Sequence, residues 1–369
     1  MKIFKILLIL IFFNIKPFVC RIDKENQSLK TVFITGGAGF IGSNFLKYMF
    51  HKYPNYQFLV LDSLTYAGNL DNISDDIKFS SRFRFFYGSI TNQSLVDFLM
   101  NQAHFVVHFA AESHVTRSIY DDTDFFVTDV MGTRTMMNSL VRHPNVERYI
   151  HISTSEVFGT AEQEPMSETH PLNPRSPYAA AKAGADRLVY AYWCTYNIPA
   201  VLVRPFNNFG PNQHTEKVIP RFITDAIKGE PLTIHGTGNQ KRDWVHTNDI
   251  ARALDIILHH SDFKKIKNQI FNLGSGKAIS ILDIARIVLS KFNLPENNLK
   301  FIGDRPGQVD LHISSTEKTK ALLGWEPEIS FADGIDEVIN WYKQNEEWWQ
   351  KRELLKLIPI FTDQKIEYQ

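Results

Sequence analysis

The chain has 369 residues with 40 basic and 40 acidic side chains, and 44% of its residues are hydrophobic. This is the composition of a globular protein with one large or two modest domains, and zero net charge argues against nucleic acid as the main partner. Two cysteines without metal-ligand spacing exclude a disulfide framework and a structural zinc site, so we expect no metal.

The first twenty residues form a hydrophobic segment. Lys2 and Lys5 precede the apolar run 6–13, a layout that resembles a secretory signal but is shorter than the ~20 apolar residues that span a bilayer. Two interpretations stay open: residues 1–20 make a secretory or membrane contact, or they are an extension with no export role. Residues 21–29 form a polar linker, and the folded part begins near Lys30.

A glycine-rich turn follows the first predicted strand, 31–35, and precedes a predicted helix, 43–50. Three glycines allow a tight turn, a close approach of a pyrophosphate and close helix packing, while the helix N-terminus supplies free N–H groups. The spacing differs slightly from the usual dinucleotide fingerprint, so an ordinary turn remains an alternative. The candidate cofactor-binding residues here are Gly36, Gly39, Phe40, Ile41 and Gly42.

An acidic residue ends the second predicted strand, 58–61. Asp62 lies 62 − 42 = 20 residues after Gly42. A carboxylate there suits the ribose hydroxyls of NAD and repels the 2′-phosphate of NADP. The sequence therefore predicts NAD binding; a capping Asp is the alternative.

Short apolar runs continue to alternate with helical stretches. The clearest are 83–86, 105–110, 149–153, 200–203 and 270–273. This alternation is typical of an α/β protein with a Rossmann-type, doubly wound parallel sheet. Three of the strands end in polar clusters, at 112–114, 154–156 and 204–208, and the carboxyl ends of parallel strands form the ligand-binding edge of such a sheet.

The alternation loosens after Phe206, where loops surround a smaller C-terminal α/β lobe that we expect to bind substrate. Helices are predicted at 244–259, 279–292 and 331–342. The expected division of the chain is an NAD-binding domain at 30–205 with 241–276 returning to it, a substrate lobe at 206–240 and 277–350, and a tail at 351–369.

Tyr178 and Lys182 stand four residues apart on a predicted helix and therefore share one face. A free phenol has a pKa of ~10, too high for a base at neutral pH. A neighbouring ammonium, together with the positive ring of bound NAD+, favours phenolate. The pair predicts a base that removes the proton of a sugar hydroxyl; a chance pairing on a solvated helix is the alternative.

The ordered motifs of residues 30–343 resemble those of extended short-chain dehydrogenase/reductases that act on nucleotide sugars, and most of all the dTDP-glucose 4,6-dehydratases. The motifs that carry the resemblance are 35–42, 62–70, 108–115, 153–159, Tyr178/Lys182, 207–211, 216–220, 242–244 and 304–307.

The resemblance implies a mechanism. Tyr178, assisted by Lys182, takes the proton of the sugar C4 hydroxyl, Thr154 hydrogen-bonds that oxygen, and hydride passes to NAD+. Glu156 then removes the C5 proton, water leaves from C6, and the hydride returns to C6 to give a 4-keto-6-deoxy sugar.

The resemblance also implies further ligand contacts. Ala110 and Ala111 join the cofactor-binding residues. The substrate-binding residues would be Ser113, His114, Asn207, Asn208, Lys217, Arg242 and Arg305, with the three cations near the diphosphate.

Ser155 departs from the closest pattern, which has an aspartic acid that protonates the leaving hydroxyl. A serine hydroxyl is a far poorer acid. GDP-mannose 4,6-dehydratases and UDP-glucuronate decarboxylases both resemble this chain in carrying Thr-Ser-Glu. We expect dehydration; decarboxylation of UDP-glucuronate and 4-epimerisation are the alternatives, and a non-catalytic dinucleotide-binding scaffold is another class.

The partners implied by the resemblance are a nucleotide sugar and a second copy of the chain. Helix residues Leu188, Val189, Tyr192 and Trp193 are candidate dimer contacts, although core packing explains them equally well. Because NAD and nucleotide sugars are needed together, we expect a cytoplasmic location, with the secretory pathway as the alternative.

Overall fold

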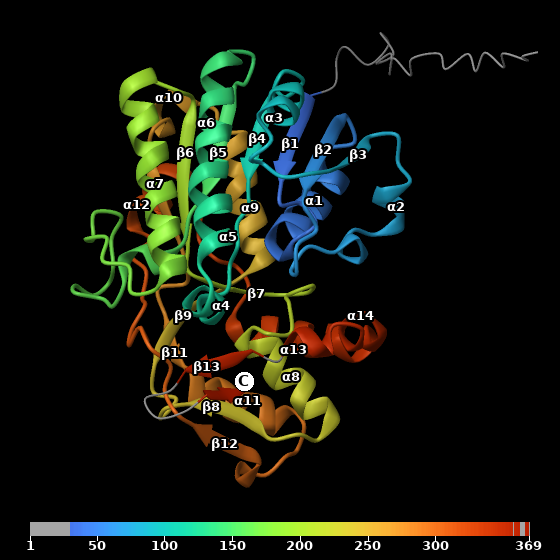
Figure 1. Ribbon diagram of the computed structural model, residues 1–369, viewed down its shortest axis with the longest axis vertical. Coiled ribbons are helices and arrows are strands. Elements are labelled where there is room, and N and C mark those ends of the chain that lie inside the picture. The colour runs from blue at the N-terminus through green and yellow to red at the C-terminus, as the bar shows by residue number, and fades with distance from the viewer. Residues whose placement is uncertain (1–29, 357, 362–365, 369) are drawn as a thin grey trace, which may run out of the picture.

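The computed structural model describes residues 30–356, 358–361 and 366–368. The predicted segment 1–20 and linker 21–29 lie outside these residues. A seven-stranded parallel sheet forms the larger half (Figure 1), with strand order β10-β6-β5-β4-β1-β2-β3. Its strands are β1 (Lys30–Thr35), β2 (Tyr56–Asp62), β3 (Phe83–Tyr87), β4 (Phe105–His108), β5 (Arg148–Ile152), β6 (Ala200–Pro205) and β10 (Ile270–Leu273).

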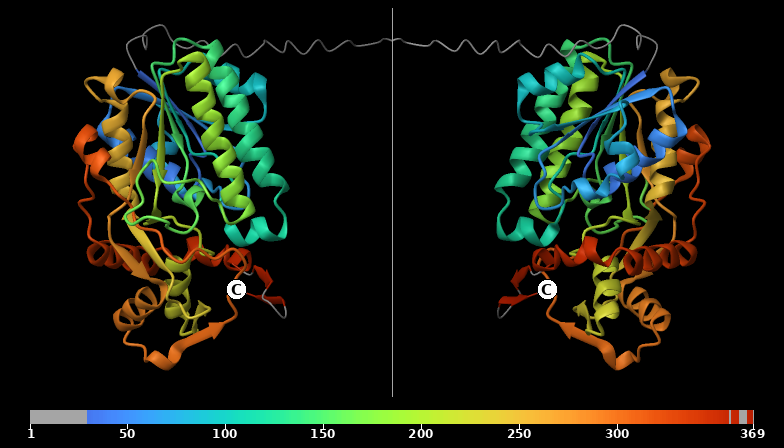
Figure 2. Two further views of the ribbon diagram at one scale, coloured as in Figure 1. Left: turned by 90° about the vertical axis from the view of Figure 1, so that its left-hand side faces the viewer. Right: turned by 90° about the vertical axis from the view of Figure 1, so that its right-hand side faces the viewer.

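Helices cover both faces of this sheet, as Figure 2 shows. Helices α1 (Phe40–Lys52) and α9 (Thr247–Leu258) pack on one face through Phe45 and Leu254. Helices α3 (Gln93–Met100), α6 (Thr133–Arg142) and α7 (Pro177–Tyr196) pack on the other through Leu99, Leu140 and Val189. The predicted doubly wound α/β fold is confirmed.

A smaller lobe lies beyond the carboxyl ends of the strands (Figure 1). Its core is formed by helices α8 (Val218–Lys228), α11 (Ile281–Lys291) and α13 (Phe331–Gln344), with β8 (Leu232–His235) paired to β12 (Leu299–Ile302). A small sheet in the order β11-β9-β7 joins the two halves; its strands are β7 (Asn207–Phe209), β9 (Lys241–His246) and β11 (Ala278–Ser280).

Two of the predicted helices begin too early. Residues 244–246 belong to β9, and Ile279 belongs to β11, so α9 starts at Thr247 and α11 at Ile281. The apolar residues of these segments are compatible with the period of a helix or of a strand. They form strands because β9 pairs with β7 and β11. Segment 241–246 therefore lies in the small sheet. The chain returns to the large sheet with α9 and β10, and the later residues Leu323 and Trp325 join the same core.

The remaining elements are short. They are η2 (Leu70–Asn72), α2 (Asp75–Lys78), α4 (Val115–Tyr120), α5 (Thr123–Phe125), the π-helical turn η3 (Phe126–Gly132), η4 (Ser155–Phe158), α10 (Phe263–Ile266), η5 (Glu296–Asn298), α12 (Glu317–Leu323), α14 (Glu346–Gln350), η6 (Glu353–Lys356), and the hairpin β13 (Pro359–Phe361) and β14 (Ile366–Tyr368). Among the described residues, no helix is long and apolar enough to span a bilayer.

Candidate active site

The glycine turn between β1 and α1 has no room for side chains at two positions. Gly36 has φ +69°, and a Cβ there would lie 2.6 Å from the nitrogen of Ala110. A Cβ at Gly42 would lie 2.3 Å from the oxygen of Gly36. These glycines let three backbone segments meet at the N-terminus of α1, which is the cradle a pyrophosphate requires.

Asp62 ends β2 beside this turn and is buried. Its carboxylate accepts hydrogen bonds from the backbone N–H of Ala38 at 2.9 Å and of Leu64 at 2.8 Å. Burial raises the pKa of Asp62, and these two hydrogen bonds oppose that rise. The carboxylate thus ties the loop after β2 to the glycine turn while one edge still borders the cleft.

All ten predicted cofactor-binding residues line one cleft of about 190 Å³. They are Gly36, Gly39, Phe40, Ile41, Gly42, Asp62, Ala110, Ala111, Tyr178 and Lys182. Their convergence, the crowded glycine turn and the acid at the end of β2 fit a bound dinucleotide. The role of each residue in binding remains a prediction.

Tyr178 and Lys182 lie in the first two turns of α7, which begins with the Ser176 side chain accepting a hydrogen bond from Ala179 N–H and with proline at its first position. Both of these predicted catalytic side chains are buried. Lys182 Nζ donates to the backbone oxygen of Ile152 at 2.7 Å, so β5 fixes the direction of the ammonium.

The predicted acidification of the phenol by Lys182 is wrong for the protein alone. Burial, Asp129 and Glu156 all raise the pKa of Tyr178, and only a hydrogen bond with Thr154 lowers it. Lys182 is not among the groups that lower the pKa of Tyr178, and its ammonium donates to the Ile152 carbonyl. A positive charge on a bound ligand would lower the pKa of Tyr178 and so favour phenolate.

Asp129 is a residue of this site that the sequence did not reveal. It is 1% exposed in the π-helical turn η3, and its Oδ1 accepts the backbone N–H of Glu112 at 2.9 Å. Its Oδ2 has no hydrogen-bond partner among the described residues. Burial raises the pKa of Asp129 to about 7, against the opposing charge of Lys182. A buried aspartate next to the predicted catalytic Tyr–Lys pair is visible only in three dimensions.

Asp129→Asn should shift the acidic limb of the kcat/KM pH profile to lower pH. The charge of Asp129 raises the pKa of Tyr178, so its removal lets the phenol lose its proton at lower pH, while the asparagine oxygen can still accept the Glu112 N–H. The exposed Asp124→Asn is the matched control and should leave the profile in place. An unmoved limb in Asp129→Asn would contradict this electrostatic role.

Thr154, Ser155 and Glu156 follow β5. The Thr154 hydroxyl oxygen accepts the Glu156 N–H at 3.2 Å and so caps η4, which leaves the hydroxyl proton available for Tyr178. Burial favours the neutral form of Glu156, but His312, when it is protonated in acid, and the cations Arg242 and Arg305 outweigh burial and hold the pKa of Glu156 below its usual value. Glu156 is therefore a carboxylate that can accept a proton.

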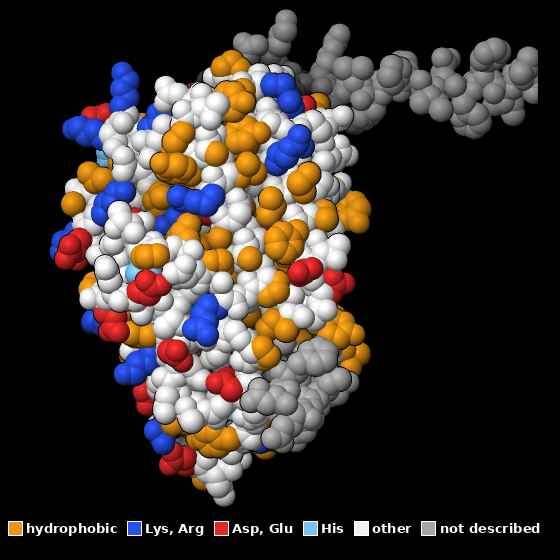
Figure 3. Space-filling model, turned by 60° about the vertical axis from the view of Figure 1, so that its left-hand side comes forward, with side chains coloured by type: hydrophobic (Ala, Val, Ile, Leu, Met, Phe, Trp, Pro, Cys, Tyr) orange, Lys and Arg blue, Asp and Glu red, His pale blue; other side chains and the backbone are white. Residues whose placement is uncertain are grey.

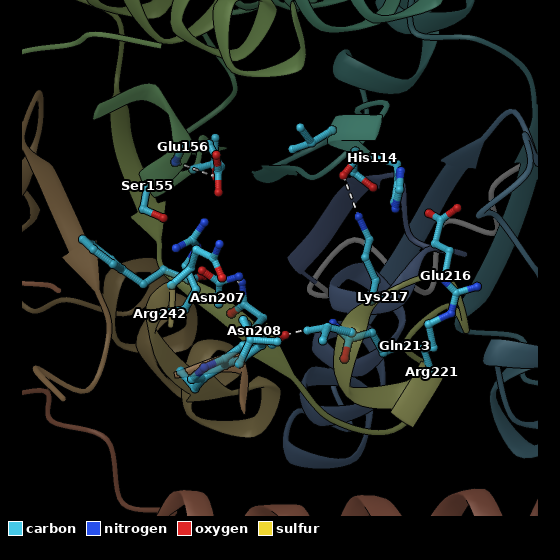
Figure 4. Close-up of a pocket in the computed structure, with 18 of the residues that line it drawn as sticks. His114, Ser155, Glu156, Asn207, Asn208, Gln213, Glu216, Lys217, Arg221 and Arg242 are labelled. Carbon is cyan, nitrogen blue, oxygen red and sulfur yellow. Dashed lines mark hydrogen bonds between the residues drawn. The ribbon is translucent and has the colours of Figure 1, made fainter. Parts of the chain in front are cut away.

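A second cavity of about 310 Å³ adjoins the cofactor cleft; Ser113, Tyr178 and Lys217 line both. The structure places all the predicted substrate-binding residues on its wall: Ser113, His114, Asn207, Asn208, Lys217, Arg242 and Arg305. Thr154, Ser155 and Glu156 line it too. Figure 4 shows Glu156 and Arg242 on one side of this cavity and Lys217 on the other.

Hydrogen bonds to neighbouring residues position two cationic side chains of this cavity. Lys217 Nζ donates to Ser113 O at 2.6 Å, and Arg305 Nε donates to Gln308 Oε1 at 3.2 Å. Glu216 lies behind Lys217; burial would raise its pKa, but His114 and Lys217 hold it at about 2. Side-chain atoms of the cavity residues that have no hydrogen-bond partner among the described residues include Asn208 Oδ1, Gln213 Oε1 and Arg221 Nη1. This wall fits an anionic, polar ligand.

Several lining residues were not predicted from the sequence: Gln213, Glu216, Arg221 and Gln308. Glu216 belongs to the motif 216–220, and its position next to the predicted ligand Lys217 could have indicated it. Arg221 could have been found only from its place one turn after Lys217 on α8.

The parallel sheet, the glycine turn and the Thr154–Tyr178–Lys182 group together define an extended short-chain dehydrogenase/reductase. Residues 33–338 match the family model described as GDP-mannose 4,6 dehydratase, and the chain belongs to that family.

Individual proteins agree with this assignment. The low-salt glycan biosynthesis protein Agl12 of Haloferax volcanii is 41% identical over 86% of this chain and 99% of its own length. The dTDP-glucose 4,6-dehydratase of an Actinoplanes species is 36% identical over 86% of this chain and 99% of its own. A solved dTDP-glucose 4,6-dehydratase of Streptomyces venezuelae, a double mutant with NAD bound, has a TM-score of 0.83 and 37% identity over 87% of this chain and 99% of that one.

Proposed function

We propose that the protein is an NAD-dependent nucleotide-sugar 4,6-dehydratase of the dTDP-glucose 4,6-dehydratase kind. The observation that carries the proposal is the position of Glu156. This ionised carboxylate shares a cavity wall with Thr154 and Tyr178, where the cavity adjoins the dinucleotide cleft. Oxidation at C4 needs Tyr178 and Thr154, and only elimination across C5–C6 needs an additional base.

The ten residues of the cleft would hold NAD, with the pyrophosphate at the glycine turn and the adenosine ribose at Asp62. When bound there, NAD+ would supply the hydride chemistry at C4 and C6, and its positive ring would favour the phenolate form of Tyr178.

The residues of the chain perform the proton transfers and hold the substrate. Tyr178 takes the proton of the C4 hydroxyl, and Thr154 hydrogen-bonds that oxygen. The resulting 4-keto group acidifies the C5 hydrogen, which Glu156 removes. Lys217, Arg242 and Arg305 would neutralise the diphosphate and keep the sugar in register with these groups.

A decarboxylase is the second candidate, and Ser155 is the observation that favours it, since loss of carbon dioxide needs no acid for a leaving hydroxyl. Glu156 favours the proposed dehydration over epimerisation, which needs no C5 base. The segment 112–115 (Glu-Ser-His-Val) favours dehydration over decarboxylation, because it resembles the dehydratases and not the decarboxylases. A panel of dTDP-glucose, GDP-mannose, UDP-glucose and UDP-glucuronate, followed by mass spectrometry and chromatography of the products, separates the candidates. A product lighter by one water supports dehydration; loss of carbon dioxide, or an epimer of unchanged mass, overturns it.

The proposed homodimer pairs the face formed by η3, α6 and α7. Figure 3 shows a band of hydrophobic side chains down this face. Its exposed apolar residues are Phe126, Val127, Met131, Val141, Tyr190 and Tyr196. The sequence had suggested Val189 and Trp193 as contacts; they are buried in the core of the subunit instead.

Val127→Lys and Met131→Lys should each weaken self-association by about tenfold or more, because a lysine buried at an interface without a partner costs more than about 1.4 kcal/mol. Sedimentation velocity over a range of protein concentrations measures the change. Phe79→Lys, an equally drastic change at an 85% exposed position away from this face, should leave association unaltered. If the three variants associate alike, the dimer does not use this face.

A cytoplasmic location follows from the proposed substrates, since NAD and nucleotide sugars must be available together.

A further inference from the structure

His312 lies directly behind the candidate substrate cavity. Its side chain is fully buried, and it does not line the cavity, whereas its neighbours Ser155 and Glu156 do. Ser155 and Glu156 are the polar residues through which His312 can act on a bound substrate. The mechanism described so far assigns it no role.

The hydrogen bonds of His312 fix which ring nitrogen carries the proton. Nε2 lies 2.8 Å from the backbone oxygen of Gly159. A carbonyl oxygen can only accept, so Nε2 is the donor. The other nitrogen, Nδ1, lies 3.3 Å from Ser155 Oγ and 3.8 Å from Glu156 Oε1.

The ring is neutral near pH 7. Burial, with the charges of Arg242 and His170, lowers the pKa of His312 to about 4, and Glu156 and the hydrogen bond to Gly159 only partly oppose this shift. A neutral ring that donates from Nε2 has a lone pair on Nδ1. The group within hydrogen-bonding distance of that lone pair is the Ser155 hydroxyl, which must therefore be the donor.

A serine hydroxyl has one proton. If Ser155 gives that proton to His312, only its oxygen lone pairs can face the cavity. We propose that His312 is a positioning residue for the elimination step: by accepting the Ser155 proton it makes Ser155 a hydrogen-bond acceptor for the C6 hydroxyl of the sugar. This inference rests on the proposed dehydratase function.

The consequence is that Ser155 orients the leaving oxygen and Glu156 protonates it. Glu156 takes the C5 proton, and the electron pair of the C5–H bond forms the C5=C6 double bond. The C6–O bond breaks with its electron pair going to oxygen, and the proton on Glu156 moves to that oxygen. Water leaves, and Glu156 is again a carboxylate, so the step needs no outside acid.

Two substitutions of His312 test this assignment as a matched pair. His312→Asn places an amide oxygen near the position of Nδ1 and keeps an acceptor for Ser155. His312→Gln places an amide near the position of Nε2, keeps the bond to Gly159 and loses the acceptor. We expect kcat of the asparagine variant within about tenfold of wild type and kcat of the glutamine variant about 10²-fold lower, with KM nearly unchanged, as for a misplaced reacting group.

The glutamine variant should still oxidise C4, so reduced nicotinamide should accumulate during a single turnover, and the C5 hydrogen should still exchange with solvent deuterium. Equal kcat in the two variants, or losses that follow their thermal unfolding midpoints, would overturn the proposal. If neither variant folds, Ser155→Ala replaces them. Reduced nicotinamide should accumulate in this variant as well, and a Ser155→Ala enzyme without that accumulation would overturn the proposal. A wild-type enzyme that removes water from no sugar nucleotide refutes the dehydratase function itself, whereas an active wild type with equal variants refutes only the role of His312.

Discussion

Tyr178→Phe should lower kcat by about 10²–10⁴-fold, the range for loss of a positioned general base. The phenol is buried at the junction of the two cavities and is hydrogen-bonded by Thr154. Phenylalanine fills the same space but cannot take the proton of the C4 hydroxyl. Formation of the 4-keto product, followed by chromatography, measures the loss.

The content of bound NAD in this variant should stay close to that of wild type, since the glycine turn, Asp62 and Lys182 are intact. Tyr87→Phe is the control, because this tyrosine is 74% exposed at the end of β3. A Tyr178→Phe enzyme that keeps activity within about tenfold of wild type would assign C4 deprotonation to another group.

Glu156→Gln should separate oxidation from elimination. Glutamine keeps the shape of the side chain but cannot accept the C5 proton, so dehydration should fall by about 10³-fold, within the range for removal of a general base. Oxidation at C4 depends on Tyr178 and Thr154, so reduced nicotinamide should still appear on mixing with substrate.

Incubation in deuterium oxide checks the role of Glu156 directly. The wild-type enzyme should incorporate deuterium at C5, and Glu156→Gln should not. Glu317→Gln, at an exposed position in the first turn of α12, should behave as wild type. Undiminished exchange at C5 in Glu156→Gln would show that another residue is the base. His312→Gln, by contrast, should still exchange the C5 hydrogen. Glu156→Gln therefore tests removal of the C5 proton, and His312→Gln tests departure of the C6 hydroxyl.

Much of the fold follows from patterns that are local in the sequence. Each strand of the large sheet is a short apolar run, and the sheet is buried on both faces, which gives such runs their composition. The candidate site follows from the same architecture: polar residues after β4, β5 and β6 meet because the carboxyl ends of parallel strands share one edge.

The start of β9 could not be predicted in this way. Residues 241–246 become a strand because β7 and β11 supply partners, and those partners are distant in the sequence. The direction of Lys182 is another example. The four-residue spacing correctly puts it on the face of Tyr178, yet its ammonium is directed by the carbonyl of Ile152, 30 positions earlier.

The two residues that extend the mechanism, Asp129 and His312, were invisible for the same reason. His312 meets Ser155 across 157 positions of sequence, and the unpartnered oxygen of Asp129 becomes apparent only when its surroundings are known. Their influence is electrostatic or indirect, so neither belongs to a short motif that reports its role.

Hydride transfer within a single sugar is the central claim, and a substrate carrying deuterium at C4 tests it most directly. NMR and mass spectrometry of the product should find the deuterium in the new C6 methyl group of a 4-keto sugar that has lost one water. Deuterium that remains at C4, or that is lost to solvent without reaching C6, would contradict the account.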